Sequence, residues 1–224
     1  MRISSHDARW GALLAAPTVL GLLALNVYPF VQTLALSFSR TQAFGRSTFA
    51  GLENYARMFA STEFWRATWN TVYFCLLTVP AGVLLALLTA VLLNQGVRGR
   101  AAFRAAYFLP MVVPPAAVAL LWKWMFNARY GVINALLGTS VGWVTDPALV
   151  LISCALVAVW SAVGYDAVLL LAGLQAIPAT YYEAAALDGA SAAQRFFRIT
   201  LPMVSPTLFF VVILRAMASL KVYD

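Results

Sequence analysis

Five apolar segments, each long enough to cross a lipid bilayer as a helix, constrain this 224-residue chain more than any other feature. A bilayer core about 30 Å thick needs about 20 apolar residues in a helix. The chain is also too poor in charge for a water-soluble globule, since 10% of its residues are charged against about 25% in soluble domains. We therefore expect an all-α integral membrane protein that forms one transmembrane domain, residues 1–224. The expected spans are residues 11–36, 71–93, 105–126, 148–174 and 201–220.

The third expected span is interrupted near its start by Pro110, Pro114 and Pro115. Proline removes a helical hydrogen bond that lipid cannot replace, so such a break needs neighbouring helices or a water-filled cavity to satisfy the freed carbonyls. We interpret three prolines within six residues as a functional bend. A simple packing kink is the alternative for any one of them.

A carboxylate, Asp166, lies inside the fourth expected span. Such groups cost roughly 2.5–3.5 kcal/mol to insert and usually face the interior of a helix bundle. Asp166 could line a solute path together with Trp160 and Tyr165, because aromatic and carboxylate groups suit polyhydroxylated ligands. The alternative is a packing role. Arg215 in the fifth span has the same two alternative roles, in a solute path or in packing. In the packing role, Asp224 or a later segment would be its partner.

Missing residue types exclude several kinds of chemistry. His6 is the only histidine, so the chain has neither a His-based catalytic triad nor a His-ligated metal site. Neither lysine, Lys123 or Lys221, follows a glycine, which excludes a phosphate-binding P-loop. Cys75 and Cys154 lie within apolar runs and are expected to be reduced packing residues. We expect no enzyme, no metal site and no bound cofactor, so that any ATP and Mg²⁺ would be bound by partner subunits.

Residues 175–200 form a polar gap between the last two spans. Thr180–Glu183 and Ser191–Gln194 both fit the capping-box pattern that starts a helix. Gly189 can adopt the left-handed conformation that ends one. The loop is therefore predicted to hold two short helices joined at Gly189, with a face of alanines that another backbone can approach closely.

The same loop carries a spaced motif. Glu183-Ala184-Ala185 is followed after three residues by Gly189, after nine more by Ile199, and after one more by Leu201-Pro202. This spacing resembles, without a gap, the EAA loop of binding-protein-dependent ABC importer permeases. The likeness to sugar-type permeases, related to the maltose and glycerol-3-phosphate importers, extends over essentially the whole chain. Stretches that carry it include Phe49–Tyr55, Phe108–Pro110, Trp122–Asn127, Tyr130–Asn134 and Ala172–Pro178.

The resemblance implies the ABC importer permease fold, with six spans, both termini in the cytoplasm and the EAA loop on the cytoplasmic side. Counts of Arg and Lys do not orient the five spans, because seven would lie on one side and eight on the other. Five spans would place Asp224 outside. We therefore expect a sixth span that these residues do not include.

The resemblance also implies a function: a permease subunit of an ATP-driven importer for a carbohydrate or polyol, working by alternating access in a bacterial or archaeal cytoplasmic membrane. The implied partners are a second permease of similar fold, two ABC ATPase subunits, an extracytoplasmic solute-binding protein and membrane lipid, with no nucleic acid. The residues expected to couple the permease to its ATPases are Glu183, Ala184, Ala185, Asp188, Gly189, Arg195, Ile199, Leu201 and Pro202.

A secondary transporter or channel driven by an ion gradient is the alternative function. It would explain the broken third span, and it would make Asp166 an ion site. It does not explain the EAA spacing, and the spans lack the further acids that a proton relay would use.

Overall fold

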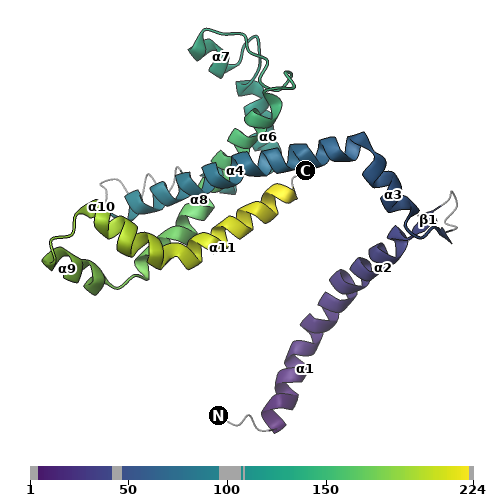
Figure 1. Ribbon diagram of the computed structural model, residues 1–224, viewed down its shortest axis with the longest axis horizontal. Helices are drawn as coiled ribbons and strands as arrows, with labels where there is room; N and C mark the ends of the chain where they lie inside the picture. Colours follow the sequence, from purple (N-terminus) through teal and green to yellow (C-terminus); the bar gives the residue numbers. More distant parts are fainter. Residues whose placement is uncertain (1–4, 42–46, 96–106, 108, 222–224) are drawn as a thin grey trace. The chain divides into compact units, whose positions relative to one another are not determined.

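The computed structural model describes residues 5–41, 47–95, 107 and 109–221, and most of them are helical (Figure 1). The chain divides into two compact units, Met1–Ala67 and Thr68–Asp224.

The first unit begins with a long apolar helix that coincides with the first expected span. The residues from Arg9 to Ser37 form one helical segment, long and apolar enough to cross a membrane. A π-helical turn interrupts it, and there the N–H of Tyr28 donates to the carbonyl of Leu23. Pro29 has no N–H to offer the carbonyl four residues before it, so the helix widens at this point. Its parts are α1 (Ser5–Leu22), η1 (Leu23–Val27) and α2 (Tyr28–Ser37).

A small hairpin and a short helix complete this unit: β1 (Ser39–Thr41) and β2 (Ser47–Phe49), which pair antiparallel, and α3 (Glu53–Ala60). The Asn54 side chain donates to the carbonyls of Ser37 and Ser39, both at 2.9 Å. Glu53 accepts from Arg40 and from Arg57 at the surface. These side chains hold the hairpin against the end of α2.

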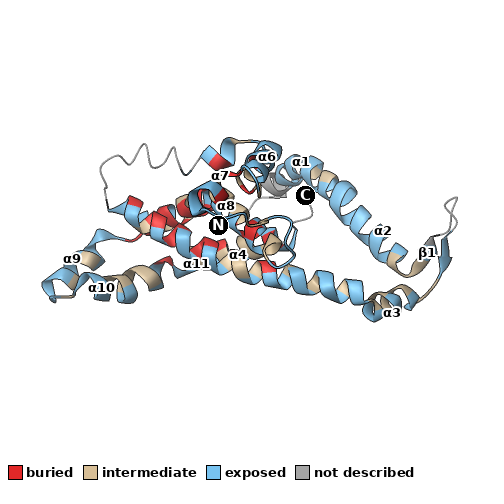
Figure 2. Ribbon diagram, turned by 90° about the horizontal axis from the view of Figure 1, so that it is seen from above, coloured by how far each residue is buried: buried red, intermediate tan, exposed pale blue. Residues whose placement is uncertain are grey.

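Three long helices form the core of the second unit. Their buried residues meet where α4, α8 and α11 lie together (Figure 2). Gly82, Ala86 and Ala90 recur every four residues on α4 and leave room for close helix packing. A Cβ on Gly173 of α8 would lie only 2.7 Å from the Thr207 hydroxyl of α11, so these two helices also pack closely. The core helices are α4 (Thr62–Asn94), α8 (Val150–Gln175) and α11 (Leu201–Leu220).

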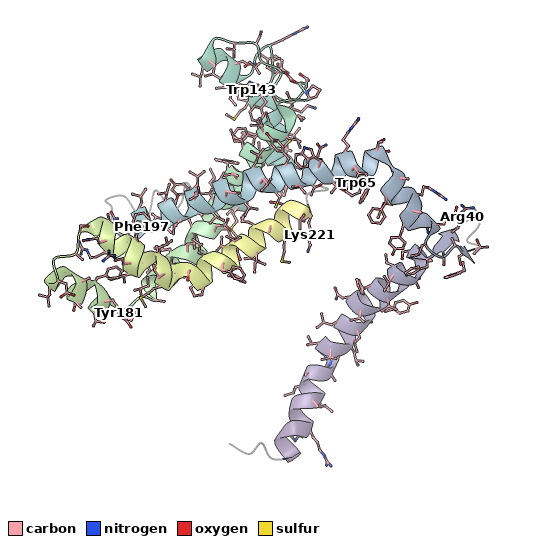
Figure 3. All side chains as sticks on the ribbon, in the orientation of Figure 1. Arg40, Trp65, Trp143, Tyr181, Phe197 and Lys221 are labelled. Carbon is pink, nitrogen blue, oxygen red and sulfur yellow. The ribbon has the colours of Figure 1, made fainter. Side chains whose placement is uncertain are left out.

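The remaining helices of this unit are α6 (Pro115–Met125), α7 (Val132–Leu137), α9 (Ala179–Leu187), α10 (Ala192–Arg195) and the π-helical η2 (Phe196–Thr200). Asn134 organises the loop that holds α7. Its side chain is 3% exposed, donates to the Val141 carbonyl at 2.9 Å and accepts from the indole N–H of Trp143 at 2.9 Å. Trp143 and Tyr181 mark opposite ends of this unit (Figure 3).

Among the described residues, four helical segments are long and apolar enough to cross a membrane: Arg9–Ser37, Thr62–Asn94, Val150–Gln175 and Ala192–Leu220. They coincide with the first, second, fourth and fifth expected spans, with shifted ends. The second begins at Thr62 rather than residue 71, because helix α4 includes nine further residues whose charged and polar members, such as Glu63 and Arg66, lower the local hydropathy.

The third expected span, residues 105–126, is not one continuous helix: its described residues are broken at residues 113–114. Residues 105, 106 and 108 lie outside the described part. The rest consists of a helical turn at residues 109–112, a break, and α6. Pro114 takes an extended conformation with ψ 138° and begins α6, where Pro115 needs no hydrogen-bond donor. The prolines therefore bend the chain as predicted.

Candidate functional site

The predicted EAA loop folds as two short helices at one end of α8 and α11 (Figure 1). Gly189 separates them with φ +73°, which confirms the expected left-handed stop. The N–H groups of Gly189 and Ala190 return to the carbonyls of Ala186 and Ala185, at 3.1 and 2.9 Å. This is the Schellman pattern, in which a left-handed residue closes the end of a helix.

Of the two predicted capping boxes, the second is confirmed. The Gln194 N–H donates to the Ser191 hydroxyl at 3.3 Å, and the Ser191 N–H donates to the Gln194 side chain at 2.7 Å. The first prediction, at Thr180–Glu183, is wrong. The N-cap of α9 is Pro178, whose ψ of 134° starts the helix before Thr180, and no side chain among the described residues caps it.

The second helix of the loop is a rigid extension of the membrane helix. α10, η2 and α11 follow one another without a break, so Ala192–Leu220 is one helical segment. Pro202 explains the π turn between them, because it offers no N–H and the N–H of Leu201 reaches back to Phe196. The hydroxyl groups of Tyr182 and Thr200 lie 3.0 Å apart and tie α9 to this extension.

The residues expected to couple the protein to its ATPases divide by exposure. Glu183, Ala184, Asp188, Gly189 and Pro202 are exposed, whereas Ala185, Arg195, Ile199 and Leu201 are half-buried. Leu187, which sequence reasoning did not select, is the most exposed of the large apolar side chains in the described residues, at 90%. Tyr181 and Phe197 are also exposed at this end (Figure 3). The sequence signal that could have identified Leu187 is that it is a large apolar residue close to Gly189 in an otherwise polar loop.

A concave surface, which we call the loop hollow, lies between the two arms. Its volume is about 310 Å³. It is lined by Ala185, Asp188, Gly189, Ala190, Gln194, Arg195, Arg198 and Ile199. Sequence reasoning missed Arg198, because only the fold brings it to the same surface as Gly189.

The structure brings Asp166 and Arg215 together as a buried ion pair between α8 and α11. Asp166 is 1% exposed. Arg215 contacts both of its carboxylate oxygens, at 3.1 Å through Nη2 and through Nε to the other oxygen. The same Nη2 donates to the carbonyl of Ala162 at 3.3 Å. Asp224, the partner suggested by sequence, lies outside the described residues.

The other two residues of the expected solute path lie apart from Asp166. Trp160 is 39% exposed and borders a cavity of about 820 Å³ between α4 and α8. Tyr165 is 42% exposed. It neighbours Asp166 in sequence, but successive side chains on a helix point about 100° apart. A second cavity, of about 590 Å³, is lined by Trp122, Lys123 and Ser161 among others.

Comparison with known proteins identifies the same family as the residue spacing in the EAA loop. Residues 78–223 match the family model described as "Binding-protein-dependent transport system inner membrane component". The trehalose/maltose transport system permease protein MalF of Thermococcus litoralis is 36% identical over 228 residues, covering 100% of this chain and 77% of that protein. The sn-glycerol-3-phosphate transport system permease protein UgpA of Salmonella typhimurium is 33% identical over 211 residues, covering 92% and 72%.

A solved structure also matches. A crystal structure of a bacterial ABC transporter involved in the import of the acidic polysaccharide alginate has a chain with a TM-score of 0.82 and 26% identity, covering 97% of this chain and 75% of that one. The family match does not favour the ion-gradient alternative. This chain belongs to the inner membrane components of binding-protein-dependent transport systems, and it is a multi-pass permease subunit of an ABC importer.

Proposed function

We propose that this permease subunit carries a carbohydrate or polyol-type solute. The relatives of this chain support this class: trehalose/maltose, sulfoquinovosyl glycerol and sn-glycerol-3-phosphate systems are all transporters of hydroxyl-rich molecules. The cavity beside Trp160 offers an aromatic wall of the kind that such solutes stack against. Trp160 and Tyr165 are accordingly the path residues of this proposal, whereas the burial of Asp166 against Arg215 supports the packing alternative for that carboxylate.

The same proposal makes the EAA loop the coupling element. ATP and Mg²⁺ would be bound by two partner ATPases that dock on it from the cytoplasm. The loop and the N-terminus would then share the cytoplasmic side, since the first four predicted spans separate them. The single observation that carries the coupling role is the rigid two-armed loop, whose exposed residues surround a left-handed Gly189.

Motion of this loop would pass into the membrane as a rigid-body shift of helices. One arm, α10, continues directly into α11, and the other is tied to it through Tyr182 and Thr200. Deeper in the bundle, the Asp166–Arg215 pair links α8 to α11. A push on the loop therefore moves both helices together, as alternating access requires.

Substitution of Gly189 by leucine tests this role. The φ of +73° costs a residue with a side chain about 1–2 kcal/mol, although no described atom lies within 4 Å of where the Cβ would be. We expect Gly189→Leu to abolish ATP-dependent uptake by the assembled complex in proteoliposomes while the subunit stays in the membrane. Gly138→Leu is the matched control, because Gly138 has φ +63° and equally open surroundings within the described residues, at the other end of α8. Unchanged uptake in Gly189→Leu would refute the coupling role.

A further inference from the structure

The loop hollow carries positive charge that the described residues do not neutralise. Its lining includes two arginines, Arg195 and Arg198, and one acidic residue, Asp188. Within the described part of the chain, neither arginine has a carboxylate oxygen within 4.0 Å. The Nε of Arg195 is buried and finds no acceptor there. A buried donor without an acceptor is unfavourable, so this side chain is suited to an acceptor from outside.

The hollow is also formed in advance. Its floor is the Schellman turn at Gly189, its far wall begins with the Ser191–Gln194 capping box, and the Tyr182–Thr200 contact fixes the two arms. Ala185, Gly189 and Ala190 leave the approach free of large side chains. A ligand would therefore meet a backbone frame that is already in place, and little of its binding free energy would be lost in ordering that frame.

We propose that the loop hollow receives a glutamate or aspartate side chain of the docking ATPase, held by Arg195 and Arg198. Guanidinium groups pair with carboxylates through two parallel hydrogen bonds. Two guanidinium groups and one carboxylate leave a net charge of +1, which suits a single carboxylate. Leu187, 90% exposed on the adjoining arm, supplies the apolar contact that surrounds a buried pair in a protein interface. This inference rests on the coupling role proposed above and adds the chemistry of the partner.

The test is retention of the ATPase on the purified complex. The double variant Arg195→Glu/Arg198→Glu should bind the ATPase about tenfold more weakly, which corresponds to about 1.4 kcal/mol. Arg195→Lys, which keeps the charge but loses the fork, should fall between this variant and the native chain. Arg129→Glu, the same kind of substitution made once at an exposed arginine outside the loop, should have no effect. An acid-to-arginine change on the docking face of the ATPase should restore binding to the double variant.

Comparing Gly189→Leu with the double variant distinguishes failure of this inference from failure of the coupling role. If Gly189→Leu uncouples transport but the double variant binds the ATPase normally, the loop couples without this carboxylate and the inference is overturned. If neither variant changes binding or transport, the coupling role fails as well. Uptake is also compared in vesicles with and without anionic lipid. If the double variant keeps the ATPase, and anionic lipid stimulates uptake by the native complex but not by the double variant, the hollow holds a lipid headgroup and the inference is again overturned.

Discussion

At the scale of single residues, the Asp166–Arg215 pair determines how α8 and α11 fit together. Each charge alone would be costly inside a membrane, and the pair removes much of that cost by placing the two groups in direct contact. Asp166 is 1% exposed, and Arg215 also satisfies the carbonyl of Ala162. Removal of one partner leaves the other charge buried and unneutralised.

Asp166→Ala should therefore destabilise the subunit by about 3–5 kcal/mol, the usual loss when one partner of a buried pair is removed. Thermal unfolding of the purified complex in detergent measures this change. Glu53→Ala is the matched control: it breaks the pairs with Arg40 and Arg57, but its side chain is 51% exposed and the loss should stay below about 1 kcal/mol. Equal shifts in the two variants would show that the buried pair adds nothing to stability.

At the scale of elements, the two arms of the EAA loop begin in different ways. α10 has a full capping box at Ser191, whereas α9 starts at Pro178, whose fixed φ and extended ψ place the next residues in a helix. Both starts fitted the same sequence pattern. Only α10 is capped by a side chain. In α9, Pro178 is the N-cap and Ala179 is the first helical residue, so Thr180 lies inside the helix and cannot cap it.

Ser191→Ala should loosen α10 by about 1 kcal/mol, since the backbone N–H of Gln194 loses its acceptor. Amide hydrogen exchange at Gln194 should rise about fivefold, the factor that 1 kcal/mol gives. Thr180→Ala should leave the exchange of α9 within twofold of the native rate. A larger effect at Thr180 than at Ser191 would contradict the assignment of the caps.

At the scale of the whole molecule, energy is expected to enter at the loop and act on the bundle. The second unit concentrates its buried residues on α4, α8 and α11 (Figure 2). α4 and α11 are further joined by a hydrogen bond of 2.8 Å between Thr78 and Ser219. Two of these three helices begin or end at the loop, so a partner that moves the loop displaces most of this core.

Uptake by the complete complex should accordingly require ATP and be inhibited by vanadate, and it should persist when ionophores dissipate the ion gradients. Proteoliposomes that hold the permease subunits without the ATPases serve as the control and should show no uptake. Transport that follows an imposed ion gradient in those vesicles would favour the secondary-transporter alternative instead.

Local sequence was enough to predict most of the helices. Runs of apolar residues predicted four of the long helices, because a helix buried in lipid needs only sufficient length and hydropathy. The left-handed turn at residue 189 was predicted because glycine adopts that conformation readily. The full extent of α4 was not predicted, since residues 62–70 include charged and polar side chains but are still helical. The three prolines showed where the third span bends, although its length suggested a continuous helix.

By itself, then, the sequence determined the membrane class, the position of the loop and, through the EAA spacing, the family. These properties depend on residues that are close together along the chain. The tertiary structure alone decided the pairing of Asp166 with Arg215 and the gathering of Arg195, Arg198 and Gly189 around one hollow. Both depend on how helices pack and on which way each side chain points, and contacts between separate helices leave no local pattern in the sequence.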